Sequence, residues 1–216
     1  MSVGCRCCWC ARLAGFGDEL ASHALANYRL VGSQDKVWPF NWKLGLETFV
    51  ESYHIFSLHR DTLARQLKSA PILCEFRGRH GGGLVMGNKC VELLEKPESE
   101  WQRVGCATLV YWLFPNTVLS MPQAGHAELW SFVPLDARPE SCVASVRFFA
   151  APTAPPEEAF WQRLIAYTMG VVEAEDFAKQ VLIQRNFGSG LLEETVFGCN
   201  EPALIHFHEQ LDAMLA

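Results

Sequence analysis

The middle of the sequence consists of short apolar segments separated by turn residues, and this block limits the possible folds more than any other feature. Its six segments are rich in Val, Phe, Trp and Tyr, and Gly, Pro or Asn separates one from the next. They cover residues 72–76, 84–86, 104–114, 117–120, 127–133 and 142–149. Segments of this kind are typical of consecutive β-strands. The block therefore predicts an antiparallel meander.

Helical periodicity precedes and follows this block. Apolar residues recur at helical spacing in four stretches, and the second, largely buried stretch follows Asn41, a residue in position to cap a helix. The four stretches cover residues 18–28, 42–53, 157–185 and 202–215, and a short helix is expected at 90–101 within the strand block. Strands in one block with helices on either side predict an α+β domain, an antiparallel sheet with helices on one face.

The composition fits one compact domain. The chain has 216 residues, of which 50% are hydrophobic and 19% are charged. We expect residues 1–15 to be an appended N-terminus and residues 16–216 to form the domain. Four cysteines crowd the appendage without a nearby histidine, so we interpret them as part of a frayed end rather than a zinc knuckle. They are Cys5, Cys7, Cys8 and Cys10.

The net charge of the chain limits the classes of partner that it can bind. The 18 basic and 24 acidic side chains give a net charge of −6, which argues against a general binder of nucleic acid or anionic membranes. No apolar run reaches the roughly 18 residues needed to span a bilayer, and no secretion signal is recognisable. We therefore expect a cytoplasmic protein with reduced thiols, whose partner is a small molecule or another protein.

The residues most suggestive of chemistry are Glu51, His54 and His59. Glu51 and His54 are three positions apart and share one face of a helix. His59 follows His54 by five positions, about 140° away on an unbroken helix, so both can bind one ion only if the helix loosens or ends near Phe56. Two imidazoles and one carboxylate on one face of Fe(II) leave positions open for substrate and oxygen. The spacing alone also fits an ordinary polar pair.

This stretch resembles a known family. Asn41-Trp-Lys, then Glu47, then Glu51-Ser-Tyr53-His54 and His59 after four intervening residues, is similar to the start of the catalytic domain of Rieske-type non-haem iron oxygenases. These proteins are the α subunits of ring-hydroxylating and related demethylating systems. The resemblance extends from about residue 16 to the end, through residues 113–117, 128–134, 173–176, 184 and 207–208.

The resemblance implies a fold and a set of metal ligands. The fold is a helix-grip domain of the Bet v 1 or START-like type, in which the sheet wraps around a buried helix. The iron ligands would be His54, His59 and Asp176, although Glu173 and Glu175 are close enough in sequence to replace Asp176.

The resemblance also suggests roles for two residues that do not bind the metal. Glu51 stands where many members have an aspartate that links an iron-bound histidine to the cluster of a neighbouring subunit. A glutamate occurs there in the branch that acts on carnitine-like quaternary amines. Asn41, at the start of the motif, would orient the site without binding the metal.

The activity implied by the resemblance is oxygen chemistry at Fe(II). Such a domain activates O2 next to a bound small organic substrate, aromatic or amine, and hydroxylates or demethylates it. Aromatic residues of the strands are candidate pocket walls, with plain core packing as the alternative. They are Trp112, Phe114, Trp130 and Phe132.

One part of the family pattern has no match in this sequence. Members carry a two-iron, two-sulfur cluster held by Cys-x-His and Cys-x-x-His, and the stretch before Asn41 is too short for such a domain. Electrons would therefore come from a Rieske or ferredoxin cluster on another polypeptide and its reductase, or the domain no longer turns over. The family's frequent assembly is a homotrimer.

Alternatives to the oxygenase hypothesis stay open at this level. One is a non-catalytic helix-grip protein that binds a small hydrophobic ligand, and another fills the same three ligands with Zn²⁺ for hydrolysis. The glycine-rich residues 77–83 favour a hairpin turn or an active-site lid over a phosphate loop. His126 and Glu128 alternate on one face of a strand, and we interpret them as an exposed polar face rather than a metal pair.

Overall fold

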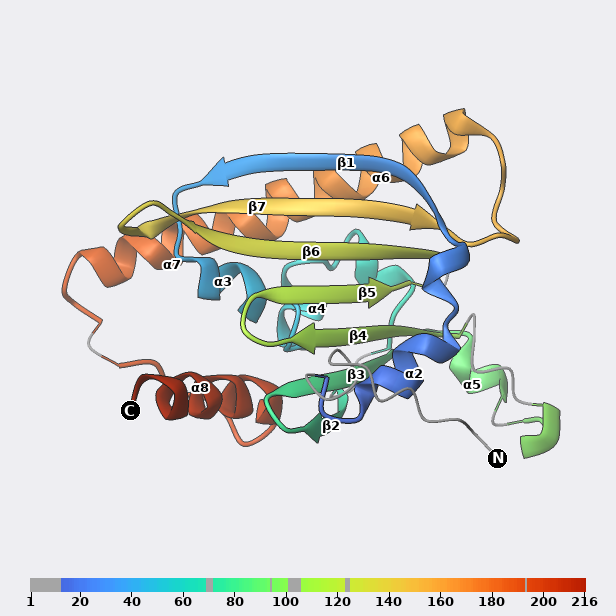
Figure 1. Cartoon of the computed structure of the whole chain (residues 1–216), viewed down its shortest axis with the longest axis horizontal. Helices are drawn as coiled ribbons and strands as arrows, with labels where there is room; N and C mark the ends of the chain where they lie inside the picture. The colour runs from blue at the N-terminus through green and yellow to red at the C-terminus, as the bar shows by residue number, and fades with distance from the viewer. Residues whose placement is uncertain (1–12, 69–71, 94, 101–105, 123–124, 193) are drawn as a thin grey trace.

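The computed structural model describes residues 13–68, 72–93, 95–100, 106–122, 125–192 and 194–216 (Figure 1). The cysteines expected in a frayed terminus, Cys5, Cys7, Cys8 and Cys10, lie outside these residues. Among the helices of the described residues, none has the length and apolar character needed to cross a membrane.

A single antiparallel sheet of seven strands forms the centre of the fold (Figure 1). The strand order is β1-β7-β6-β5-β4-β3-β2, so that β2 to β7 form the predicted meander and the first strand closes on the last. The strands are β1 (Arg29–Trp38), β2 (Leu73–Arg77), β3 (His80–Met86), β4 (Ala107–Leu113), β5 (Thr117–Met121), β6 (His126–Leu135) and β7 (Arg138–Ala150). The predicted α+β class is thereby confirmed.

Strand β1 was not predicted from the sequence. It pairs along its length with β7, whose residues lie more than a hundred positions further along the chain. Most of its residues are exposed on both faces because it forms one edge of the sheet, so it lacks the alternation that marks a half-buried strand. An edge strand whose partner is distant in sequence leaves no local signal.

The helices are shorter than their apolar periodicity indicates. The stretch after Asn41 divides into α3 (Trp42–Glu47) and α4 (Tyr53–Ser57), and the long stretch into α6 (Glu158–Val171), the π-helix η4 (Val172–Phe177) and α7 (Ala178–Gly188). The remaining helical segments are α2 (Phe16–Ser22), α5 (Cys90–Leu93) and α8 (Pro202–Leu215), with short 3-10 turns η1 (Leu25–Asn27), η2 (Leu63–Arg65) and η3 (Glu98–Glu100).

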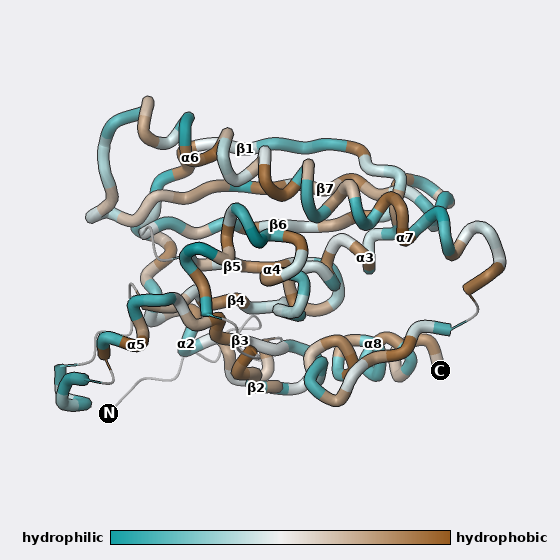
Figure 2. The backbone as a smooth tube through the Cα atoms, turned by 180° about the vertical axis from the view of Figure 1, so that it is seen from behind, coloured by the Kyte–Doolittle hydropathy of each residue, from teal (hydrophilic) through white to brown (hydrophobic). Residues whose placement is uncertain are grey.

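Most of the helices pack on one face of the sheet, and the short helix α2 packs on the opposite face. Helices α6 and α7 lie behind β1 and β7 in Figure 1 and in front of them in the reverse view of Figure 2. On that face the main core gathers side chains of α3, η4 and α8 against the inward residues of the strands. On the opposite face Phe16 of α2 packs with Tyr111, Leu119 and Ala127.

The glycine-rich segment is part of the sheet and forms no lid. Gly78, with φ +58°, and Arg79 make the tight turn between β2 and β3, and the glycines that follow lie in β3. The Trp112 ring of the neighbouring strand lies across them, and a Cβ on Gly81 would stand 2.1 Å from that ring. Glycine is required there because the indole occupies the space of a side chain.

Candidate metal centre

The end of helix α4 separates the two histidines of the motif. His54 lies within α4, and the helix ends at Ser57, where the N–H of Leu58 donates to the carbonyl of His54 at 2.6 Å. The N–H of His59 donates to the same carbonyl at 3.4 Å, a wider turn than an α-helix makes. The predicted end of the helix near Phe56 is confirmed, and it turns His59 toward the side of His54.

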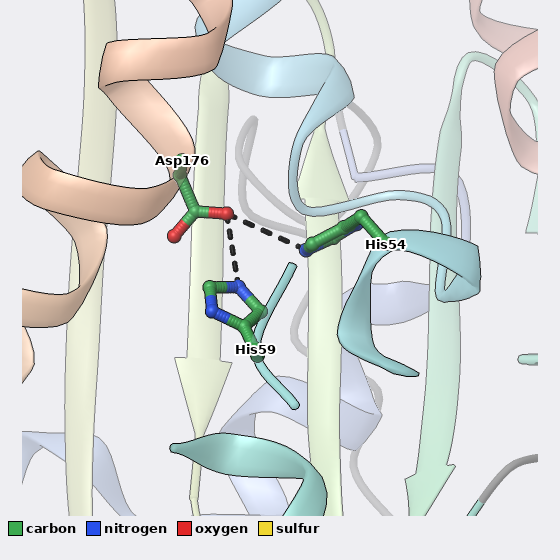
Figure 3. A group of neighbouring side chains, drawn as sticks. All are labelled: His54, His59 and Asp176. Carbon is green, nitrogen blue, oxygen red and sulfur yellow. Dashed lines mark hydrogen bonds and ion pairs between the residues drawn. The ribbon is translucent and has the colours of Figure 1, made fainter. Parts of the chain in front are cut away.

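The third residue comes from the π-helix η4. Its wider turns bury Val172, Asp176 and Phe177, whereas the following helix α7 has no fully buried residue. Phe177 packs among the core aromatics Trp38, Phe40 and Phe132 and thereby anchors the segment. Asp176, its neighbour in the chain, projects toward the two histidines (Figure 3). Such π-bulges inside α-helices occur frequently at functional sites.

The three side chains converge on one point. Asp176 Oδ1 lies 3.0 Å from His59 Nε2 and 3.4 Å from His54 Nε2 (Figure 3). One potential ligand atom from each residue lies within 4.8 Å of the others. Imidazole nitrogen together with carboxylate oxygen suits Fe(II) and also Zn²⁺. The donor set therefore fits a single divalent ion held by two histidines and one carboxylate.

In each of the two imidazole rings a carboxylate contacts Nδ1, the outer nitrogen, which faces away from the point where the three side chains converge. His54 Nδ1 contacts Glu51, whose other oxygen also accepts the N–H of Tyr53 at 2.6 Å. His59 Nδ1 lies 2.6 Å from Glu175 Oε2, which also accepts from the hydroxyl of Thr62 at 2.8 Å. A proton on Nδ1 leaves the Nε2 lone pair facing inward, which is the usual outer-sphere support for a metal-binding histidine.

The surroundings of His59 favour its charged form. Its side chain is 1% exposed, and this burial alone lowers the pKa. Hydrogen bonds and negative charge from Asp176 and Glu175 outweigh the burial and raise the pKa of His59 above its ordinary value of 6.5. A metal ion binds neutral imidazole, so the raised pKa of His59 means that metal binding competes with protonation.

The alternatives to Asp176 make other contacts. Glu173 bonds Lys36 Nζ at 2.5 Å and Gln34 Nε2 at 2.7 Å on strand β1. Glu175 is bound to the outer nitrogen of His59, as described above. The structure therefore groups Asp176, and neither glutamate, with the two inner nitrogens.

A cavity of about 360 Å³ lies beside the three converging residues. His54, His59 and Asp176 form part of its wall, together with Phe49 after α3, side chains of α6 and inward-facing residues of β3 to β6. Most of the wall is apolar, and its volume is within the range of small-molecule sites. The cavity provides room for a small organic molecule next to the three ligand atoms.

The four aromatic residues expected as pocket walls do not line this cavity. Val110 and Glu128 line it, and Trp112 and Trp130 follow them by two positions on the same strand faces. Phe132 packs against Gly45 of α3, and Phe114 packs on Phe207 of α8. The prediction identified the inward face of the sheet but not the part of it that the helices leave open.

Phe49 and Tyr167 are aromatic residues of the cavity wall that the sequence analysis missed. The ring centroid of Phe49 lies 5.2 Å from that of Trp130. The position of Phe49 in an apolar helical stretch indicated core packing alone, so the sequence carried no signal for this role.

Asn41 supports the framework at some distance from the cavity wall. It caps α3 by accepting the N–H of Lys43 at 2.9 Å, donates to the carbonyl of Pro139 at 2.6 Å, and its own N–H donates to Gln184 at 2.8 Å. It is not among the residues that line the cavity beside Asp176. Its predicted influence on the site can act through the placement of α3.

His126 and Glu128 are buried, contrary to the exposed polar face expected from the sequence. Their residue exposures are 4% and 6%, and both line the cavity. The signal was available, because alternation along β6 puts them on the same face as Trp130 and Phe132. Elsewhere, His206 contacts the carbonyl of Gly78 and His208 contacts Glu47, so these two histidines face different partners.

Comparisons with known proteins agree with this architecture. A family model for the ring-hydroxylating alpha subunit (catalytic domain) matches residues 23–216. The quaternary ammonium Rieske monooxygenase CntA, in complex with an inhibitor, superposes with a TM-score of 0.76 at 16% identity, covering 96% of this chain and 56% of that one. No curated protein sequence matches.

Two further solved structures share the fold. Naphthalene 1,2-dioxygenase from Rhodococcus sp. gives a TM-score of 0.63 at 18% identity, covering 94% of this chain and 61% of that one. Dicamba monooxygenase bound to dicamba gives a TM-score of 0.63 at 11% identity, covering 87% of this chain and 58% of that one. The chain thus spans between 56% and 61% of the length of these proteins. At these identities the likeness shows the fold.

Proposed function

Because the chain belongs to the family of ring-hydroxylating alpha subunits, through their catalytic domain, we propose that it is an oxygenase component with one Fe(II) ion bound by His54, His59 and Asp176. The observation that carries the proposal is the convergence of these three ligand atoms within 4.8 Å beside a mostly apolar cavity. Iron bound there would supply the activation of O2 that hydroxylates or demethylates a small organic substrate.

The protein's own residues prepare the site for this chemistry. Glu51 and Glu175 hold the outer nitrogens of the two histidines, which keeps the inner lone pairs directed at the metal position. Burial of His59 and Asp176 restricts water on the protein side, while the cavity side stays open for substrate and oxygen. Thr62 fixes the carboxylate of Glu175 in turn.

The substrate is a small aromatic or amine compound under this proposal. Supporting observations are a cavity of about 360 Å³ with a mostly apolar wall and the ring of Phe49. Apolar walls orient a substrate by shape and leave its C–H bonds close to the ligand atoms.

Electrons come from outside this domain in the proposal. A Rieske or ferredoxin cluster and a reductase supply them, and Glu51 is the residue through which a neighbouring cluster faces His54. Glu51 and His54 also line a second, more open cavity, together with Lys179 and Gln180, so both are accessible from that side. A homotrimer and a cytoplasmic location complete the proposal.

Isotope incorporation tests the function. Protein loaded with Fe(II) is combined with a Rieske ferredoxin, its reductase, NADH and ¹⁸O2, and small amines and aromatic compounds are supplied as substrates. The expected result is either ¹⁸O in a hydroxylated product or a demethylated product accompanied by formaldehyde that carries the ¹⁸O, with no product when iron or the ferredoxin is omitted. The absence of product for every substrate that binds would contradict an oxygenase role.

The second candidate function is a non-catalytic ligand-binding protein. The mostly apolar cavity is the observation that favours it, because its volume suits a small hydrophobic molecule regardless of the metal. The same isotope experiment separates the two functions, since this candidate binds the compounds without converting them.

A further inference from the structure

A second polar group lies in the cavity wall, on strand β6. His126 Nε2 lies 2.8 Å from Glu128 Oε1, and Trp130 Nε1 donates to Glu128 Oε2 at 3.1 Å. Both His126 and Glu128 are more than nine-tenths buried, and both line the cavity that also reaches Asp176. The carboxylate of Glu128 is therefore held at both oxygens and fixed in place.

This carboxylate has no permanent countercharge in the wall. Among the described residues that line the cavity there is no lysine or arginine, whereas Glu51, Glu128 and Asp176 are acidic. Glu51 and Asp176 contact His54 and His59 at the proposed metal centre. Glu128 contacts His126 and a neutral indole, and it lies outside the group of ligand atoms whose charge the proposed metal ion would compensate. A buried charge without an opposite charge is unfavourable unless a ligand supplies one.

The neighbours of Glu128 leave capacity to bind a donor. A carboxylate offers about four lone-pair positions, and the two donors His126 and Trp130 use two of them. His126 Nδ1 has no hydrogen-bond partner among the described residues. Ser120 lies directly opposite Glu128 on β5 and also lines the cavity. Acceptors therefore outnumber donors in this part of the wall.

Building on the proposed function, we propose that Glu128 recognises the ammonium group of an amine substrate and selects against anionic compounds. The protonated amine donates its N–H to Glu128 and supplies the missing positive charge. Because Glu128 and the three proposed ligands line one cavity of about 360 Å³, a small amine bound at β6 presents its carbon end toward His54, His59 and Asp176.

Three probes of equal ring size and different charge test this assignment. Benzylammonium, benzyl alcohol and benzoate are titrated into the metal-free protein by calorimetry at neutral pH. The expected order of affinity is benzylammonium, then benzyl alcohol, then benzoate. Because the measurement needs neither iron nor turnover, its failure leaves the test of the oxygenase function untouched.

Two variants assign the selectivity to Glu128. Glu128→Gln keeps the shape of the side chain and removes its charge, and it should weaken benzylammonium binding by about tenfold or more while benzyl alcohol changes less than about twofold. Glu140→Gln, an exposed glutamate of β7, is the matched control and should leave all three affinities unchanged. Ser120→Lys retains Glu128 but places an ammonium opposite it that compensates its charge, and should remove the preference for benzylammonium over benzoate.

Circular dichroism and thermal melts first establish that each variant is folded. If Glu128→Gln does not fold, the binding measurements on Ser120→Lys decide the test. Equal affinities of the parent protein for the three probes, or no binding of benzylammonium, would overturn the proposal. So would an equal loss of benzylammonium and benzyl alcohol binding in Glu128→Gln, since that pattern marks a purely structural pair.

Discussion

The two polar parts of the cavity wall combine histidine with carboxylate in different structural settings. His54, His59 and Asp176 come from a helix that ends early and from a π-helix, both departures from regular geometry. His126 and Glu128 come from regular alternation along strand β6. Irregular backbone brings ligands from distant segments to one point, whereas the regular strand displays a fixed row of side chains. The proposed metal site therefore depends on local backbone geometry, and the polar part of the wall at β6 depends on the regular sheet.

The largest expected effect comes from removing the π-helix. Deletion of Ala174 takes one residue out of η4 and replaces its i→i+5 hydrogen bonds by the i→i+4 pattern of an α-helix, which removes the backbone geometry that directs Asp176 toward the two histidines. We expect loss of stoichiometric Fe(II) binding with helix content retained, measured by metal analysis and circular dichroism. Amine binding at Glu128 should persist in the same protein. Unchanged metal binding would show that the π-helix is not needed to place Asp176.

The aromatic residues beyond the wall should affect stability rather than binding. Phe132 is fully buried between Gly45 and Phe177, so Phe132→Ala removes core contacts and leaves a cavity. We expect a loss of about 3–5 kcal/mol in the free energy of unfolding, measured in guanidinium chloride. Ligand affinity of the folded fraction should not change. A large change in ligand affinity without a loss of stability would contradict this and show that Phe132 contributes to the pocket wall.

Glu175 and Glu173 form a matched pair within one π-helix. Glu175→Gln weakens the hold on His59 Nδ1 and should lower metal affinity by about 10- to 100-fold. Glu173→Gln removes the same charge two residues away, where it contacts Lys36 and Gln34, and should leave metal affinity near that of the parent. Competition with a fluorescent chelator measures both. Equal losses in the two variants would indicate a general charge effect in place of positioning.

The smallest effect is expected at the edge of the sheet, where Asp35 of β1 binds Arg147 of β7. The hydrogen bond and charge of this arginine lower the pKa of Asp35 below its ordinary value of 3.8. Its stabilising contribution is therefore present above that value and disappears as the pH falls through the lowered pKa. The difference in Tm between the parent and Asp35→Asn should be small at neutral pH and vanish in acid. A difference that grows on acidification would contradict this sign.

The sequence predicted those parts of the molecule that depend on neighbouring residues. The spacing of His54 and His59 required an early helix end, and the structure has it. The apolar segments and the turn residues between them specified the meander of strands β2 to β7. Each of these features is encoded within a few consecutive residues, so periodicity and turn chemistry suffice to find it.

The parts that depend on distant contacts were not accessible from the sequence. Helical periodicity leaves Asp176, Glu173 and Glu175 equivalent, and only the family resemblance singled out Asp176. In the structure the geometry of the π-helix distinguishes it from the two glutamates. Strand β1 is defined by its pairing with β7. The part of β4 and β6 that lines the cavity depends on where α3 and Phe49 cover the sheet. The cavity wall therefore includes Val110 and Glu128 and excludes Trp112 and Trp130.

The most direct test of the metal centre is the iron content of protein reconstituted anaerobically with Fe(II), for the parent, His54→Ala and Asp176→Ala. We predict about one iron per chain in the parent and none retained by either variant after gel filtration, because two histidines and one carboxylate are the ligands that the described residues bring together there. Iron retained in Asp176→Ala, or no stoichiometric iron in the parent, would contradict the proposed metal centre.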